Sequence, residues 1–179
     1  IVHANDVLPT NADGSLPFIQ NSDQFYLSGI DQEETILVLF PDAADPKQRE
    51  MLFVRETNET IAVWEGEKLT KPQATERSGI QRVHWLTDFE TQFRSVMCQA
   101  DQVYLNSNEH IRATIPTETR EMRFTHRCKL EYPLHDYRRL APLMHELRVI
   151  KSDHEITALK EAIRITSDGF DRLTKFVKP

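Results

Sequence analysis

Two histidine–glutamate pairs are the first residues whose types and spacing could do chemistry. The pairs at residues 145–146 and 154–155 each begin like the helical zinc-protease motif His-Glu-x-x-His. The second histidine is replaced by Val149 after the first pair and by Ala158 after the second. None of the seven histidines lies four residues from another, so we expect metal binding only through a coincidence of folding.

The residues that could act as nucleophiles lack the neighbours that would activate them. Cys98 and Cys128 lie 30 residues apart without a Cys-x-x-Cys pair, which predicts two buried free thiols and neither a zinc site nor a disulfide framework. No serine stands in a Gly-x-Ser-x-Gly elbow. The five glycines are too scattered to cradle a phosphate: Gly14, Gly29, Gly66, Gly79 and Gly169. The sequence therefore argues against nucleotide-dependent chemistry.

Length and charge further limit the kinds of protein that this chain can be. The chain has 179 residues, with 22 Lys and Arg against 28 Asp and Glu, a formal net charge of −6. That length predicts one ordinary globular domain with its own core, and the acidic balance argues against a broad nucleic-acid-binding face. The longest apolar run, Ile36–Phe40, is far shorter than a bilayer-crossing helix, and no signal segment opens the chain. We expect a cytoplasmic protein without membrane or nucleic-acid partners.

The strands expected from the sequence are short apolar runs between turn residues. Ile36–Phe40 is too short for a helix and predicts a strand buried on both faces at the centre of a sheet. Met51–Val54 and Ile61–Trp64 repeat that pattern, so the three runs predict an antiparallel meander. Val103–Leu105 is expected as a further strand, and residues 1–4 have the pattern of the end of a strand, as in part of a longer chain.

The expected helices are marked by start signals. A capping box at residues 87–90 predicts a helix whose core-facing residues are Phe89, Phe93 and Val96. Pro142 suits the first turn of a helix that continues through Leu147, after which residues 148–151 are expected to be extended.

A long amphipathic helix is expected at the end of the chain. Residues 152–155 form a second capping box, and apolar residues then recur every three or four positions as far as Val177. We expect this stripe, at residues 156–177, to be buried between chains of a dimer or larger assembly. Residues 118–131 carry mixed charges that a helix would present to solvent. Strands followed by mixed strands and helices predict an α/β protein with a mixed sheet.

Three segments, in this order, carry a family pattern. Residues 18–29 read FIQNSDQFYLSG and are followed by the apolar run at Ile36, residues 62–66 read AVWEG, and residues 145–156 read HELRVIKSDHEI. Together they resemble the N-terminal domain of the aminopeptidase P (Xaa-Pro aminopeptidase) family, within the creatinase and prolidase superfamily. The third segment is similar to the junction at which that domain leads into the catalytic one.

The resemblance implies an α/β fold in which a mixed β-sheet is flanked by helices and followed by a long C-terminal helix. Residues 1–147 would form the N-terminal domain, and residues 148–179 the junction and first helix leading toward a C-terminal pita-bread metallopeptidase domain. Family members remove an N-terminal residue that precedes proline. They use two divalent metals, usually manganese, held in that C-terminal domain by two Asp, one His and two Glu. We therefore expect no catalytic residue, metal ligand or cofactor within these 179 residues.

Three residues match cleft positions of the family. Trp64 matches a tryptophan that in tetrameric members reaches toward the active site of a neighbouring subunit, where an indole can pack on the substrate. Its other interpretation is an ordinary aromatic residue at a strand end. Asp13 and Arg148 match positions that support hydrogen bonds around the cleft. Otherwise Asp13 is a turn residue and Arg148 belongs to a surface or interdomain ion pair.

The expected function is that of a non-catalytic N-terminal domain of an Xaa-Pro aminopeptidase, serving oligomer assembly and substrate access. Its expected partners are its own C-terminal catalytic domain, further copies of the chain and, for the parent enzyme, proline-containing peptides. One alternative is a catalytically inactive pita-bread homologue, as in a histone-chaperone branch. In that protein-binding module the basic residues from Arg120 to Lys129 would form the contact surface. A prolidase or creatinase parent is the other alternative, although the segment 62–66 favours aminopeptidase.

Overall fold

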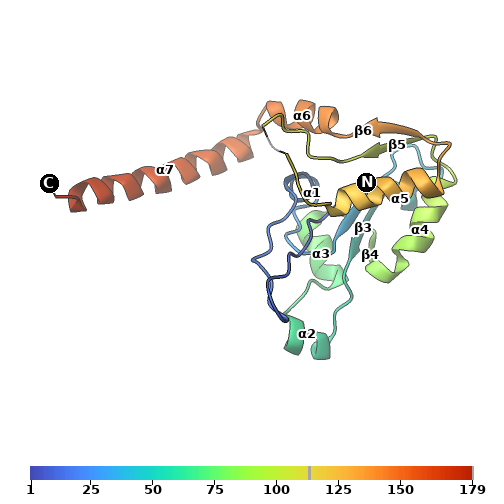
Figure 1. Cartoon of the computed structure of the whole chain (residues 1–179), viewed down its shortest axis with the longest axis horizontal. Helices are drawn as coiled ribbons and strands as arrows, with labels where there is room; N and C mark the ends of the chain where they lie inside the picture. The colour runs from blue at the N-terminus through green and yellow to red at the C-terminus, as the bar shows by residue number, and fades with distance from the viewer. Residues whose placement is uncertain (113, 179) are drawn as a thin grey trace. The chain divides into compact units, whose positions relative to one another are not determined.

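Two compact units make up the chain. The structure is a computed structural model that describes residues 1–112 and 114–178. The first unit is Ile1–Ala141, and the second begins at Pro142. The strands of the first unit form its sheets and its helices pack against them, whereas the second unit contains most of α6 (Ala141–Val149) and all of α7 (Asp153–Phe176) (Figure 1). The expected α/β class, with a mixed sheet, flanking helices and a long C-terminal helix, is confirmed.

The main sheet has four strands. Their order is β1 (Val2–His3), β2 (Ile36–Leu39), β3 (Glu50–Val54) and β4 (Val83–Trp85). β2 is antiparallel to both of its neighbours, and β4 runs parallel to β3. The expectation that the run at residue 36 forms a central strand is confirmed, since Ile36, Leu37 and Val38 are all buried.

A second, two-stranded sheet lies beside β1. It consists of β5 (Gln102–Leu105) and β6 (Asp136–Arg139), which are parallel. The nitrogen of Ile1 donates a hydrogen bond of 3.2 Å to the carbonyl oxygen of Tyr104, which connects the start of the main sheet to β5. β5 confirms the strand expected at residues 103–105.

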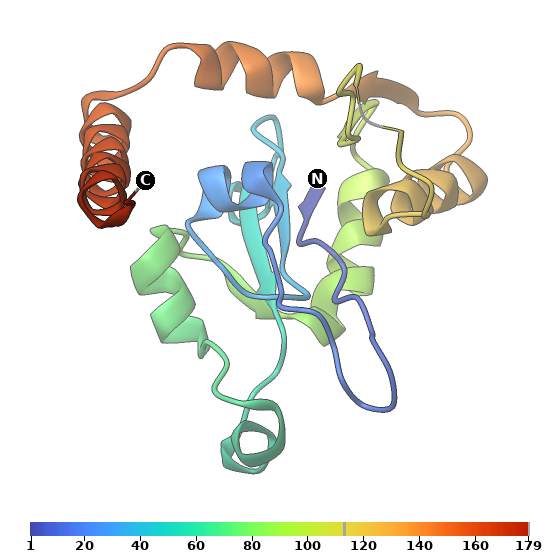
Figure 2. The same ribbon diagram turned by 60° about the vertical axis from the view of Figure 1, so that its left-hand side comes forward.

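Successive residues of β2 and β3 point to opposite faces, so the two strands serve two cores. The first core packs strand residues against α4 (Phe89–Met97) and α5 (Arg120–Glu131); its strand members are Ile36, Val38, Met51, Phe53, Val103 and Leu105. The second core lies beneath α1 (Ser22–Ser28) and α3 (Lys71–Ser78); its strand members are Leu37, Leu52 and Val54. Helices thus flank both faces of the sheet (Figure 2).

The strand expected at Ile61–Trp64 is wrong, because these residues form most of α2 (Glu59–Glu65). The Asn58 side chain accepts a hydrogen bond of 2.9 Å from the Ile61 N–H and caps the helix, which ends at Gly66 with φ of 78° and ψ of 167°. Periodicity cannot distinguish a strand from a helix in so short an apolar run, and here the capping residues decide. The antiparallel meander is therefore also wrong: β3 continues through α2 and α3 into a parallel neighbour, β4, as a crossover connection allows.

Two helix boundaries also differ from expectation. α4 begins at Phe89, after the short 3₁₀ turn η2 (Leu86–Asp88), and Thr87 does not cap it but donates to Glu56 at 2.5 Å. Its core face is confirmed, with Phe89, Phe93 and Val96 buried. α6 runs to Val149, so the extended segment expected from residue 148 is wrong for its first two residues. A second 3₁₀ turn, η1 (Pro46–Gln48), precedes β3.

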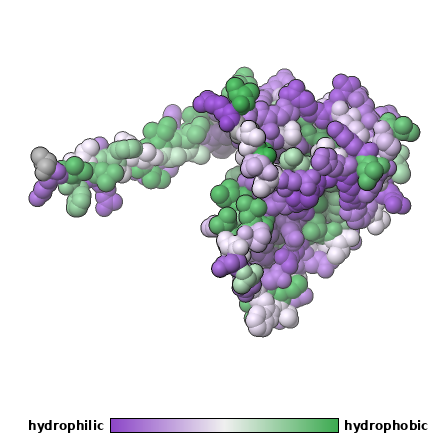
Figure 3. Space-filling model, viewed as in Figure 1, coloured by the Kyte–Doolittle hydropathy of each residue, from purple (hydrophilic) through white to green (hydrophobic). Residues whose placement is uncertain are grey.

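α7 begins at the expected capping box, in which Ser152 and Glu155 bond each other's backbone N–H. Hydrophobic residues recur along this helix, yet none of its residues is buried, and its large hydrophobic side chains are exposed by between 38% at Ile156 and 82% at Phe176 (Figure 3). Among residues 1–112 and 114–178, no helix combines the length and apolar character needed to cross a bilayer.

Candidate functional site

Trp64 lies on the outer surface of α2. Its side chain is 85% exposed, its neighbour Val63 is 78% exposed, and no residue of α2 is buried. The interpretation of Trp64 as a core or edge aromatic at a strand end is therefore wrong, since the residue neither joins a strand nor packs into a core. Its indole is free to contact another molecule.

Asp13 lies at the tip of a hairpin loop. The loop is closed by backbone hydrogen bonds from Thr10 N–H to the Gly14 carbonyl (2.9 Å) and from Leu16 N–H to the Leu8 carbonyl (2.9 Å). A Cβ atom at Gly14 would lie 2.9 Å from Thr10 Oγ1 and 3.2 Å from the Asn11 carbonyl oxygen, so a larger residue there would require both neighbours to shift. Asp13 is an exposed turn residue. Figures 1 and 2 place this hairpin and α2 at the same end of the first unit.

Arg148 belongs to α6, in the second unit, and is partly buried. Its carbonyl oxygen accepts a hydrogen bond from the Lys151 ammonium. Asp13 thus belongs to the hairpin and Trp64 to α2, two segments at one end of the first unit, and the role of all three residues at a substrate cleft stays a prediction.

Two arginines of α5, Arg123 and Arg127, are paired with acids of the same chain. Arg123 binds Asp6 at 2.5 Å, and Arg127 binds Glu90 at 2.5 Å and Glu131 at 2.9 Å. The hydrogen bonds that Arg127 donates to the carboxylates of Glu90 and Glu131 raise its pKa. Exposed pairs of this kind add little stability, but they cancel the local positive field. A basic contact surface on this helix is therefore less favoured.

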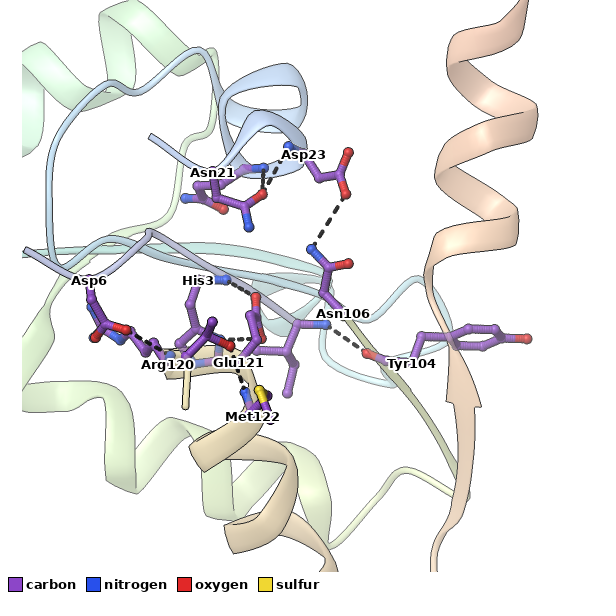
Figure 4. Close-up of polar contacts among 12 residues, drawn as sticks. His3, Asp6, Asn21, Asp23, Tyr104, Asn106, Arg120, Glu121 and Met122 are labelled. Carbon is purple, nitrogen blue, oxygen red and sulfur yellow. Dashed lines mark hydrogen bonds and ion pairs between the residues drawn. The ribbon is translucent and has the colours of Figure 1, made fainter. Parts of the chain in front are cut away.

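A buried polar cluster ties β1 to α5 (Figure 4). The His3 N–H donates to Glu121 Oε1 at 2.8 Å, and His3 Nδ1 lies 3.1 Å from Glu121 Oε2. Next to it, the Arg120 N–H donates to Asp6 Oδ2 at 2.9 Å. His3 is 2% exposed, and its ring lies 4.3 Å from that of Phe124.

The chemistry of this cluster is structural. Burial lowers the pKa of His3, although the hydrogen bond and the charge of Glu121 oppose the shift. The neutral imidazole then donates to the carboxylate, which satisfies two polar groups that would be costly to bury alone. Because both residues are buried, the cluster offers no surface to a substrate.

The cysteines and possible metal ligands form no reactive centre in the part of the chain that the structure describes. Both cysteines are free thiols, but only Cys128 is buried; Cys98 is exposed, so that half of the expectation is wrong. Burial raises the pKa of Cys128 to about 11, which keeps it protonated and unreactive. No three His, Cys, Asp or Glu side chains within residues 1–112 and 114–178 converge to hold a metal. These residues do not fit a two-metal centre, and we assign none of them as a ligand.

Residues 1–104 match the family model described as aminopeptidase P, N-terminal domain. The chain belongs to this family. It is 28% identical over its whole length to the Xaa-Pro aminopeptidase of Escherichia coli strain K12, of which it covers 41%. This agrees with the family resemblance inferred from the three segments of the sequence.

Solved structures of aminopeptidase P share the fold. A structure described as aminopeptidase P of Bacillus anthracis matches 94% of this chain with a TM-score of 0.80 and 29% identity, and the match covers 40% of that chain. A variant of Escherichia coli aminopeptidase P matches 99% of this chain with a TM-score of 0.75 and 26% identity, again over 40% of its length. The chain thus spans about two-fifths of these relatives and corresponds to their N-terminal domain.

The residues that hold α2 in place were not predicted. The Arg55 guanidinium, which follows β3, contacts the carboxylates of Glu34 (3.3 Å) and Glu65. These three residues are separated by 21 and 10 positions in the sequence. No local pattern joins them, because the turn and the helix that bring them together were not expected from the sequence.

Proposed function

We propose that the chain is the N-terminal domain of a metal-dependent Xaa-Pro aminopeptidase, is catalytically silent by itself, and supplies part of the wall of the substrate cleft. The observation that carries the proposal is the 85% exposure of Trp64 on a helix none of whose residues is fully buried. An indole in that position contributes almost nothing to the core of its own domain. Its apolar face is available to pack on the side chain of a peptide substrate.

The remaining parts of the proposal follow from the family relationship. The parent protein removes an N-terminal residue that precedes proline, and two divalent metals, manganese by preference, are held outside residues 1–179. The domain ends at about residue 147, and α7 opens the next one. Copies of the parent assemble as a homo-oligomer, so that Trp64 of one subunit reaches the cleft of another, with Asp13 and Arg148 supporting hydrogen bonds at its edge.

Replacement of Trp64 in the parent enzyme tests this function. Trp64→Ala is expected to lower kcat/KM for Xaa-Pro peptides by roughly five- to a hundred-fold, corresponding to about 1–3 kcal/mol. Trp64→Phe, which keeps an aromatic face, should lose less. The matched control is Val63→Ala, which removes apolar surface from the neighbouring exposed residue of α2 and should leave kcat/KM within about twofold.

Two results would contradict the proposal. If Trp64→Ala left kcat/KM unchanged, the indole would not be part of the cleft. If the parent cleaved only Xaa-Pro dipeptides, or hydrolysed creatine and no peptide, it would be a prolidase or a creatinase. Assays with a tripeptide that carries proline second, an Xaa-Pro dipeptide and creatine separate these outcomes.

A further inference from the structure

The segment that carries α2 is fastened at its base to one turn. This segment, Arg55–Leu69, leaves the sheet after β3 and returns just before α3. Arg55 binds Glu34, Lys68 binds Glu33, and the Leu69 N–H donates to the side-chain oxygen of Gln32 at 2.7 Å. The three consecutive residues 32–34 therefore hold both ends of the segment.

The backbone of this turn is unusual. Glu34 has φ of 57°, in the left-handed region that residues with a side chain seldom adopt. A glycine would adopt this conformation more easily, but it would lack the carboxylate that Arg55 binds. Glu33 is also held firmly: burial alone would raise its pKa, yet the hydrogen bond from Lys68, a backbone hydrogen bond and the charges of Lys68 and Arg55 together leave the pKa lowered.

Within this segment, few packing contacts fix the direction of α2. None of its residues is buried, so packing constrains it weakly. The helix ends at Gly66, whose backbone conformation is one that mainly glycine adopts. The Arg55 guanidinium contacts Glu65, the last residue of α2 and the immediate neighbour of Trp64. Arg55 thus links the helix that carries the indole to the turn that precedes β2.

We propose that Arg55 is a positioning residue, which holds α2 through Glu65 and Glu34 and so sets the direction in which Trp64 points. The inference rests on the proposed function of Trp64. Arg55 can bind two carboxylates at once because its guanidinium presents several donors in a fixed plane, which lysine lacks. The pairs are partly exposed, with side chains 35% to 44% accessible, so losing them should leave the fold intact.

The first test measures the motion of Trp64 in the 179-residue chain. The chain has two tryptophans, so Trp85→Phe leaves Trp64 as the sole reporter for time-resolved fluorescence anisotropy. Adding Arg55→Gln should increase the fast, nanosecond loss of anisotropy. Glu65→Gln should have a similar effect. The double variant should increase the fast loss of anisotropy no more than the larger single change, because both substitutions remove the same Arg55–Glu65 ion pair. The anisotropy loss in Arg55→Lys should lie between that of Arg55→Gln and that of the Trp85→Phe chain with Arg55 unchanged.

The matched control is Arg138→Gln, which removes another exposed arginine from an ion pair, with Asp136, on β6. It should leave the anisotropy decay unchanged. An unchanged decay in Arg55→Gln would overturn the inference, as would an equal change in Arg138→Gln.

The second test separates this inference from the function on which it rests. In the parent enzyme, Arg55→Gln should raise KM by about three- to tenfold while kcat changes less, because Arg55 contacts no reacting atom. Added to Trp64→Ala, it should have almost no further effect. If Trp64→Ala alone leaves KM and kcat unchanged, the proposed function fails. If Trp64→Ala impairs the enzyme and Arg55→Gln does not, the function stands and the positioning role is overturned.

Discussion

Two regions of the first unit are held in place by different physics. Around His3, rings from β1, α4 and α5 pack closely. The ring centroid of Phe93 lies 5.3 Å from the centroids of both Phe89 and Phe124. By contrast, the exposed helix α2 is held by partly exposed ion pairs. Burial of large apolar side chains is worth far more than exposed ion pairs. Substitutions in the first region should therefore change stability, and those in the second should change activity.

The largest expected effect is in the aromatic core. Phe93 is 1% exposed and also meets Tyr132, with ring centroids 5.6 Å apart. Phe93→Ala should lower the free energy of unfolding by about 3–5 kcal/mol, since it removes buried area and leaves a cavity. Urea unfolding followed by circular dichroism measures this. Leu134→Ala, at a residue 96% exposed, is the control and should change stability by less than about 0.5 kcal/mol. Equal losses in both variants would remove the distinction between core and surface.

The two tryptophans sharpen the comparison, with a smaller expected effect. Trp85, at the end of β4, packs against the second core, and Lys71 Nζ lies 4.7 Å from the centre of its ring. Trp85→Ala should cost about 1–3 kcal/mol of stability, because this half-buried ring loses apolar contacts and a cation–π interaction. Trp64→Ala should cost less than about 0.5 kcal/mol. If Trp64→Ala destabilised the chain as much as Trp85→Ala, Trp64 would be a structural residue.

The same contrast explains how much could be predicted from the sequence. The run at Ile36 and the spacing of Phe89, Phe93 and Val96 predicted buried faces correctly, because a repeated apolar pattern reflects the core against which it packs. The capping box at Ser152 was likewise sufficient to predict the start of α7.

Sequence patterns were insufficient where tertiary contacts decide the outcome. Residues 61–64 are as apolar as a strand, yet they form an exposed helix because Asn58 and Gly66 bound it and no partner strand covers it. β4 and its parallel pairing with β3 were missed, since each depends on residues far away in the chain. Of the candidate site, Trp64, Asp13 and Arg148 were predicted through the family resemblance, and their role at a cleft stays a prediction. The Arg55 link was not, because its partners come together only in the folded chain.

The smallest expected effect is a pH dependence of stability that arises in the His3 region. Burial lowers the pKa of His3 in the folded chain, whereas an unfolded histidine has a pKa near 6.5. Between these two values the unfolded state binds a proton that the folded state does not, so stability increases with pH there. The contribution of His3 is complete above about pH 6.5 and is lost as the pH falls toward the lowered pKa. The Glu121 hydrogen bond opposes the shift and limits the size of the loss.

Urea unfolding at a series of pH values from 7.5 downward, compared between the parent chain and His3→Gln, measures this contribution. The variant is expected to be less stable at neutral pH, because its side chain loses the ring packing against Phe124, but its stability should fall less steeply below about pH 6.5. His84→Gln is the matched control. Burial also lowers the pKa of His84, but that residue is only partly buried, so its removal should flatten the curve less. Parallel curves for the parent and His3→Gln would show that His3 titrates alike in both states, and the buried cluster would then not distinguish this region from the ion pairs that hold α2.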